Sequence, residues 1–341
     1  MITIAKCSKE FIKGMPKAEL HLHLEGSLEP ELKLALAKKN GVDIGQNTIE
    51  EVKAAYQFDS LSSFLAVYYP AMNVLQDEND FYALAMDYVK KAKENNVRYA
   101  ELFFDPQAHT SRGVPFEVII NGYYRAVEES PSLGVEIQLI MCFLRDMPAD
   151  SAMETFKAAL PYKDKIIGIG LDSDERNNPP SKFAEVFALA KQEGFHITMH
   201  CDIDQVNSIK HIRQALMDIG VERLDHGTNI VENPKLVEFV KERGIGFTCC
   251  PVSNSFVTSD MKGKEILELL HNGVKVTVNS DDPAYFQSYI SDDMYALASK
   301  YNLTKDDIVL LAKNSFEISW LSDEKKKEYI KQVEEYAAQN M

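Results

Sequence analysis

The sequence has 341 residues, of which 45% are hydrophobic and 26% are charged, a balance that provides enough apolar surface for a large core. Lys and Arg total 37 against 52 Asp and Glu, so the formal net charge is -15 at pH 7. A field of this sign repels nucleic-acid phosphates and acidic membrane surfaces, and we expect neither as a partner.

The first residues, Met-Ile-Thr-Ile-Ala-Lys-Cys, lack the basic start and the apolar stretch of a secretory signal. No later segment offers about 18 uncharged apolar residues in a row, the length that a membrane-spanning helix needs. We therefore expect a cytoplasmic protein. The cysteines are odd in number and lack Cys-X-X-Cys spacing, which predicts reduced, buried and structural thiols at Cys7, Cys142, Cys201, Cys249 and Cys250.

Short segments rich in β-branched and aromatic residues alternate along the chain with longer segments whose apolar residues have helical spacing. The short segments predict about eight strands, at residues 18–24, 98–104, 135–143, 166–171, 196–200, 223–225, 246–250 and 274–279. One of the intervening helices is predicted over residues 182–191, with Pro180 and Ser181 before it and Gly194 as its stop.

Regular alternation of this kind, without a Gly-, Ser- or Pro-rich linker, predicts a single α/β domain with parallel strands over residues 1–341. Strand-helix units in this number favour a closed (β/α)₈ TIM barrel. An open doubly wound sheet is the alternative, but no predicted strand is followed by a Gly-rich phosphate-binding motif. Residues 30–93 are helical in pattern and could form a cap over the barrel mouth, and residues 304–341 could form a terminal helical brace.

Two histidines alternate with leucines near the end of the first predicted strand. In the run Glu-Leu-His-Leu-His-Leu-Glu-Gly at residues 19–26, a strand would place His21 and His23 on one face and the leucines on the other. A lone buried histidine is usually a hydrogen-bonded core residue, whereas two imidazoles on one face can chelate a metal ion. This pair therefore predicts part of a metal site.

Three further strand ends carry polar residues that would complete such a site, namely His200, the Asp225-His226 pair and the Asp281-Asp282 pair. In a parallel barrel these carboxyl ends converge on one mouth. Three neutral imidazoles and one carboxylate suit a zinc ion that holds a water in an open position and lowers its pKa towards about 7. A helix N-cap ahead of the following proline would account for one carboxylate of the last pair. It would not account for both, because adjacent carboxylates repel unless a cation or hydrogen-bond donors hold them.

Five motifs fall in order at the predicted strand ends: His-Leu-His-Leu-Glu-Gly at 21–26, Gly-Leu-Asp-Ser at 170–173, Asp-His-Gly at 225–227, Cys-Pro-Val-Ser-Asn at 250–254 and Asn-Ser-Asp-Asp-Pro-Ala-Tyr-Phe at 279–286. Together they resemble the adenosine and adenine deaminases of the amidohydrolase superfamily, over nearly the whole chain. Residues 103–113, 179–183 and 281–286 are more similar to the branch that acts on free adenine than to the branch that acts on the nucleoside. The resemblance implies a zinc-dependent hydrolytic deaminase with a small purine as its substrate.

By matching position, the resemblance implies one zinc ion per chain, with four protein ligands: His21, His23, His200 and Asp281. His226 would orient the attacking hydroxide and stabilise its charge, and Asp282 would hydrogen-bond a purine ring nitrogen. Gly170 would let the base approach the backbone closely, and Asp172 in the same motif would contact the substrate. The implied reaction is attack of zinc-bound hydroxide on C6, protonation of the ring at N1, and release of ammonia. His109 could line the mouth as a further substrate contact or could simply bond to the backbone.

One position departs from the family pattern. After the third zinc histidine the family has His-Ala-Gly-Glu, whose Glu donates the proton to N1, whereas this chain has His-Cys-Asp-Ile-Asp-Gln and Ile203 stands in the place of the acid. Three readings remain open. Asp202 or Asp204 supplies the proton instead, the enzyme acts on a different purine-like substrate, or the chain is a weakly active or inactive relative that keeps the metal and the pocket. Loss of a general acid typically costs a factor of about 10² to 10⁴ in rate.

Overall fold

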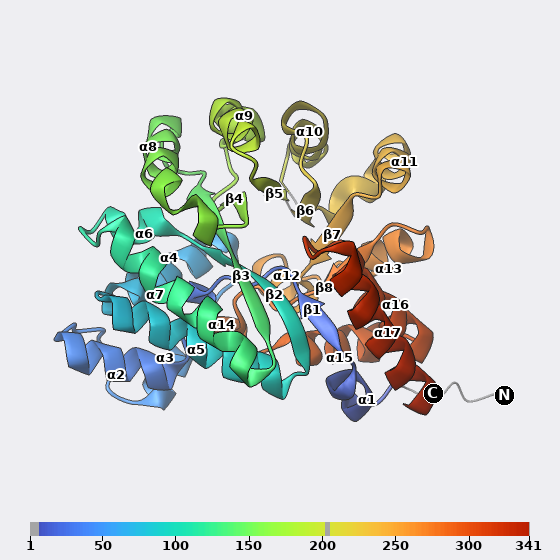
Figure 1. The fold of residues 1–341 in the computed structure, drawn as a ribbon, viewed down its shortest axis with the longest axis horizontal. Coiled ribbons are helices and arrows are strands. Elements are labelled where there is room, and N and C mark those ends of the chain that lie inside the picture. The colour runs from blue at the N-terminus through green and yellow to red at the C-terminus, as the bar shows by residue number, and fades with distance from the viewer. Residues whose placement is uncertain (1–6, 202–204, 341) are drawn as a thin grey trace.

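The computed structural model describes residues 7–201 and 205–340. Within them, eight strands form one parallel sheet in the order β1 to β8, in which each strand pairs with the next along the chain (Figure 1). The strands are almost entirely buried, as expected for a parallel sheet that is covered on both faces. They span β1 Lys17–Glu19, β2 Val97–Phe104, β3 Glu136–Leu144, β4 Gly168–Asp172, β5 His196–Cys201, β6 Arg223–His226, β7 Gly246–Cys249 and β8 Val276–Val278.

The residues just after the first strand and those just after the last strand meet at the carboxyl end of the sheet and close the barrel. The backbone N–H of His23 donates to the carbonyl of Asp281 at 2.9 Å, and the N–H of Asp281 donates to the carbonyl of His21 at 3.1 Å. The side-chain oxygen of Asn279 accepts from the N–H of Leu20 at 2.9 Å. The predicted (β/α)₈ TIM barrel is thereby confirmed, and the open doubly wound sheet is excluded.

Helices surround the barrel and connect its strands (Figure 1). They are α1 Lys9–Gly14, α2 Pro30–Asn40, α3 Ile49–Ala54, α4 Leu61–Ala71, α5 Glu78–Glu94, α6 Pro106–Thr110, α7 Phe116–Glu129, α8 Ala149–Ala159, α9 Ala184–Gln192, α10 Ser208–Arg213, α11 Pro234–Arg243, α12 Pro251–Val257, α13 Gly263–His271, α14 Pro283–Phe286, α15 Ile290–Tyr301, α16 Lys305–Glu317 and α17 Asp323–Asn340. Short 3₁₀ turns occur at Glu25–Ser27, Met72–Val74, Ser130–Leu133, Leu160–Lys165, Pro180–Phe183 and Thr228–Glu232, and a π-helical turn at Gln214–Ile219.

Most predicted strands agree with the observed ones to within two residues at each end, and two elements show differences that the structure explains. β1 ends at Glu19 instead of residue 24, because the residues that follow make only isolated bridges, Leu22 with Asp281 and His23 with Phe103. The helix predicted over residues 182–191 begins only at Ala184, after a 3₁₀ turn, and no side chain caps it.

The predicted helical cap and terminal brace are both present. Residues 30–93 form α2 to α5, and α2 ends where Gly41 adopts φ 65, a left-handed conformation that suits glycine. Phe64 and Tyr68 of α4 pack against α14, which directly follows β8; their ring centroids lie 5.1 Å from Phe286 and 5.4 Å from Tyr285, respectively. The chain ends with α16 packed on β1 and β8, and with α17 packed on α16. The cap therefore covers the end of the barrel at which the strands terminate.

All five cysteines are buried free thiols, as predicted. Burial raises the pKa of Cys142 and Cys249 well above the usual value, which keeps both thiols protonated and unreactive. In the part of the chain that the structure describes, no helix has the length and apolarity needed to cross a membrane.

Candidate active site

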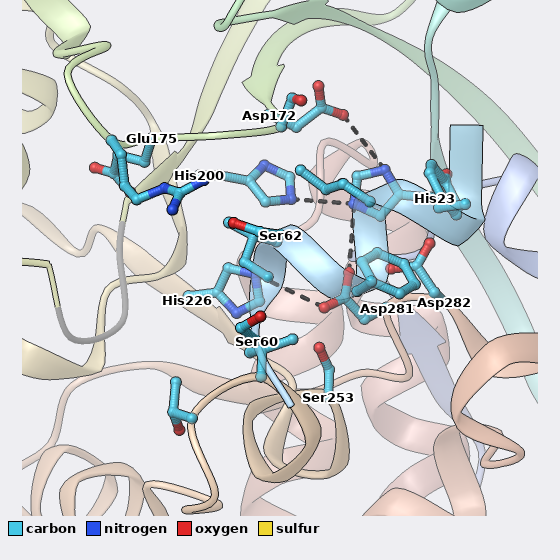
Figure 2. Close-up of a pocket in the computed structure, with 18 of the residues that line it drawn as sticks. His23, Ser60, Ser62, Asp172, Glu175, His200, His226, Ser253, Asp281 and Asp282 are labelled. Atoms are coloured by element: carbon cyan, nitrogen blue, oxygen red, sulfur yellow. Dashed lines mark hydrogen bonds and ion pairs between the residues drawn. The ribbon is translucent and has the colours of Figure 1, made fainter. Parts of the chain in front are cut away.

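Side chains from β1, β5, β6 and β8 or the residues just after them meet at the centre of the barrel mouth (Figure 2). Oδ1 of Asp281 lies 3.2 Å from Nε2 of His21 and 3.3 Å from Nε2 of His23, and the latter atom lies 3.1 Å from Nε2 of His200. One nitrogen each of His21, His200 and His226 and one oxygen of Asp281 lie within 4.8 Å of one another. The structure therefore brings together the four predicted ligands and His226, in an arrangement that can hold a metal ion.

The charges in this cluster favour neutral rings at His200 and His226, an ionised Asp281 and a positive charge at His23. Burial lowers the pKa of His200 well below its usual value and lowers that of His226 to about 3. Burial would raise the pKa of Asp281, but the imidazoles around it outweigh burial and hold this pKa well below the usual value. Burial alone would lower the pKa of His23, but the carboxylates of Asp282 and Asp281 outweigh it and raise this pKa to about 10. The negative charge of these carboxylates, which favours a proton on His23, also attracts a metal cation to the cluster.

A chain of hydrogen bonds behind His21 orients its ring. The hydroxyl of Thr248 donates to Oδ1 of Asp225, and the hydroxyl of Thr198 donates to Oδ2, each at 2.8 Å. Because the Thr248 hydroxyl has no second hydrogen, its oxygen accepts from Nδ1 of His21 at 2.9 Å, which leaves Nε2 of the neutral ring without a proton. That Nε2 faces a carboxylate oxygen of Asp281, another acceptor. A cation between the two acceptors resolves this conflict, so the donor set fits a metal ion such as zinc.

Replacing Thr248 with Val removes the hydroxyl that orients His21 and keeps the β-branched shape of the side chain. We expect the affinity for zinc to fall by about 10- to 100-fold, as is typical when a group that orients a ligand is lost. Competition of the purified protein with a chromophoric chelator measures this affinity. Thr155→Val, in α8 on the outside of the barrel, is the matched control and is expected to bind zinc as the unchanged chain does. Equal affinities for the two variants would contradict this prediction.

Two residues of the cluster have left-handed backbone conformations, which are uncommon for residues other than glycine. His226 has φ 59 and Asp281 has φ 63. His226 is the last residue of β6, and Asp281 follows the end of β8 by three residues. At both positions the backbone turns sharply and directs the side chain towards the barrel axis. Conformations of this kind cost free energy and concentrate at functional sites, where the surrounding structure enforces them.

The cluster opens onto a pocket of about 410 Å³, a volume that suits a molecule of the size of a purine base. Apolar and aromatic side chains of the cap form one wall, among them Phe64, Tyr68 and Tyr69 of α4. Asp282 and Asp172 also line the pocket, and Oδ2 of Asp172 lies 3.4 Å from Nδ1 of His23. Burial raises the pKa of Asp172 to about 7, and burial and the neighbouring Asp281 raise that of Asp282 well above its usual value.

Two predicted substrate contacts lie away from the pocket. His109 is not among the described residues that line it; the ring is fully buried, with Nε2 2.9 Å from Oε1 of Glu25. Gly170 is also absent from this set. A Cβ at Gly170 would lie 2.6 Å from Sγ of Cys142, so the glycine is needed for packing inside the barrel. Asp202 and Asp204, the predicted proton donors, lie outside the described residues.

The sequence did not single out two buried groups at this end of the barrel. Asp105 directly follows β2 and lines the pocket. Arg145 follows β3, and its guanidinium donates to the carbonyls of His200 at 2.6 Å and Asn178 at 3.1 Å, so it fixes the backbone of a candidate ligand. In the sequence, only their position after a predicted strand could have indicated a role at the site. That signal is weak, because single acidic or basic residues are common in loops.

An eight-stranded parallel barrel with a histidine and carboxylate cluster at its carboxyl mouth has the architecture of the metal-dependent TIM-barrel hydrolases. The model of the adenosine deaminase family matches residues 16–336. The chain belongs to this family, which confirms the predicted family relationship.

Individual relatives are similar over nearly their full length. The chain is 50% identical to an uncharacterized deaminase of Schizosaccharomyces pombe, over 97% of this chain and 98% of the relative. It is 46% identical to the adenine deaminase of Psychrobacter cryohalolentis, over 96% and 98%. The solved structure of an adenine deaminase from Arthrobacter aurescens aligns with a TM-score of 0.91 at 40% identity, over 95% of this chain and 100% of that one. An amidohydrolase from Burkholderia ambifaria with bound zinc aligns with a TM-score of 0.88 at 25% identity, over 99% and 96%.

Proposed function

We propose that this protein is a zinc-dependent deaminase that hydrolyses adenine to hypoxanthine and ammonia. The observation that carries the proposal is the convergence of imidazoles and a carboxylate from four strand ends on one side of a purine-sized pocket. The similarity to adenine deaminases over almost the whole chain supports adenine as the substrate. In the reaction a C6–O bond forms, the bond from C6 to the amino nitrogen breaks, and the nitrogen leaves as ammonia.

The proposed zinc ligands are His21, His23, His200 and Asp281. When bound, zinc lowers the pKa of a coordinated water towards about 7 and so supplies a nucleophile at neutral pH. Nε2 of His226 lies 3.8 Å from Oδ2 of Asp281. From this position His226 orients the attacking water towards C6 and stabilises the charge that develops on the oxygen.

Other side chains position the base. Oδ1 of Asp282 is buried and has no hydrogen-bond partner among the described residues, so it can bond to a purine ring nitrogen. Phe64 and Tyr68 of the cap cover the pocket and exclude water from a bound base. The proton for N1 comes from Asp202 or Asp204 in this proposal, which follows from the sequence alone.

Ammonia and hypoxanthine formation from adenine by zinc-loaded protein tests this proposal, with adenosine and N6-substituted adenines as further substrates. We expect turnover of adenine in the range of about 1 to 10³ s⁻¹ that ordinary enzymes reach. A chelator should remove the activity, and added zinc should restore it. The absence of turnover of every compound by protein shown to carry zinc would overturn the proposal and favour a binding protein.

Gly26 offers a second test, because it lies directly against Asp282. A Cβ at Gly26 would come within 2.0 Å of Oδ1 and 2.8 Å of Cα of Asp282. Gly26→Ala must therefore displace Asp282, and a shift of about 1 Å in a positioned group can cost roughly 10²-fold in rate. We expect a loss of about this size in kcat/KM for adenine, with zinc content and Tm close to those of the unchanged protein. Activity within twofold of normal would contradict the proposed role of Asp282.

A purine is the small-molecule partner that this function requires. The expected absence of nucleic-acid and membrane partners and the expected cytoplasmic location stay predictions. Microscopy of a fluorescent fusion of the full chain in its own cells would check the location.

A further inference from the structure

Two buried carboxyl groups line the pocket and lack hydrogen-bond partners. The exposed fractions of Asp105 and Asp172 are 1% and 2%. Among the described residues, Oδ1 of Asp105 and both carboxylate oxygens of Asp172 accept no hydrogen bond. One oxygen of each lies within 4.8 Å of the other and of a ring nitrogen of His23. Buried acceptors without donors cost free energy, so an unsatisfied pair that faces a cavity requires an explanation.

The protein itself offers these carboxyl groups little compensation. The neighbouring acid, Glu25, has donors within the protein, because Nε2 of His109 and the hydroxyl of Tyr123 each lie 2.9 Å from its Oε1. Among the described residues that line the pocket, Arg176 is the one lysine or arginine, and its guanidinium is paired with Asp174 at 2.5 Å. Within the protein, the groups nearest to the pair are the two carboxyl groups themselves, the Cys142 thiol and Nδ1 of His23, which lies 3.4 Å from Oδ2 of Asp172. A ligand in the pocket can add a stronger N–H donor to the pair.

The position of the pair relative to His23 indicates which part of a ligand it meets. One nitrogen of this ring faces the metal cluster, with Nε2 3.3 Å from Oδ1 of Asp281, and the other faces the pair, with Nδ1 3.4 Å from Oδ2 of Asp172. The pair thus lies about one imidazole ring away from the cluster. If the C6 atom of a purine is held at the cluster, the five-membered ring of the purine lies about as far from the cluster as the two carboxyl groups do. A sugar on N9 would lie farther from the cluster than that ring.

We propose that Asp105 and Asp172 accept the ring N–H of a purine that carries no sugar, and thereby select free bases over nucleosides and other N9-alkylated purines. This inference rests on the proposed function. An alkyl group on N9 removes the N–H donor, leaves the buried carboxyl groups without a partner and places new bulk against them. Sites that hydrogen-bond a substrate N–H reject analogues that lack it by about 10⁴- to 10⁵-fold.

The kinetic test compares adenine with 9-methyladenine, in which a methyl group replaces the hydrogen on N9. We expect the unchanged enzyme to prefer adenine in kcat/KM by about 10⁴-fold or more. Asp105→Ala and Asp172→Ala should each lower this preference at least tenfold, and Asp172→Asn is the substitute if an alanine variant fails to fold. Asp150→Ala, at an exposed aspartate of α8 that does not line the pocket, is the control and should keep the preference. An equal loss on both substrates would indicate a purely structural role and overturn the inference, as would a preference of the unchanged enzyme for adenosine.

Equilibrium binding separates this inference from the proposed function. Calorimetry compares hypoxanthine with 9-methylhypoxanthine on the zinc-loaded protein, without any turnover. Tighter binding of hypoxanthine by at least tenfold, with the difference lost in Asp172→Ala, would support the inference even if no compound were deaminated. Equal affinities of the unchanged protein for the two ligands would overturn it even if adenine were a good substrate.

Discussion

Replacing Asp281 with Ala is expected to lower kcat for adenine by at least about 10³-fold and to reduce the zinc content of the purified protein, since zinc is needed to lower the pKa of water from about 15.7 to about 7. The expectation rests on the contacts of this carboxylate, whose Oδ1 lies 3.2 Å from Nε2 of His21 and 3.3 Å from Nε2 of His23. Steady-state ammonia release and atomic absorption on the same sample measure the two effects.

Asp146→Ala is the matched control for this experiment. Asp146 follows β3 at the same end of the barrel, but it is exposed and does not line the pocket. We expect this variant to keep its zinc and to retain activity within about twofold, as is usual for surface substitutions. An Asp281→Ala protein with normal zinc content and normal activity would exclude Asp281 from the metal site. Normal zinc content with lost activity would instead assign Asp281 a role in catalysis other than metal binding.

The barrel can be predicted from the sequence because its determinants are local. β2 and β3 are buried on both faces and are accordingly rich in apolar and aromatic residues, whereas the helices between strands have apolar residues at helical spacing. The boundaries are less predictable where partners distant in the sequence decide them. β1 is shorter than its apolar pattern because the residues that follow bond in turn to Phe103 and to Asp281, which lie far along the chain.

The residues proposed as zinc ligands can also be located from sequence, because each lies at or soon after the end of a strand and parallel strands end at one mouth. What a strand end does not reveal is which neighbour a side chain meets. The sequence placed His109 as a possible substrate contact, and the fold turns it onto Glu25. The sequence predicted that Gly170 lets the base approach the backbone. In the fold, a glycine is required there because a Cβ atom would collide with the side chain of Cys142. Asp105 is a single acid after an apolar run, and only the arrangement of β2 and β4 places it beside Asp172.

The source of the proton for N1 gives the second large effect. The family resemblance implies that this proton comes from a glutamate at the position of Ile203, whose side chain cannot carry a proton. We expect that Asn at one of the two flanking positions, Asp202 or Asp204, lowers kcat for adenine by about 10² to 10⁴, the usual cost of losing a general acid. Asn at the other position should have a much smaller effect and serves as its matched control. Ammonia release at several pH values measures both variants, because loss of the acid also removes the limb of the pH profile on which it must be protonated.

Ile203→Glu completes this experiment. Introduced into the less active of the two Asn variants, the glutamate restores an acid at the family position, and we expect it to recover at least about tenfold of the lost activity. The glutamate side chain is one methylene longer than the aspartate that it replaces and starts one residue away from it. It reaches N1 only if the base is bound in the orientation that the family resemblance implies. Recovery would therefore support both the acid and the orientation of the base. If neither Asn variant slows the reaction and the glutamate gives no gain, the proton reaches N1 from a group other than Asp202 or Asp204.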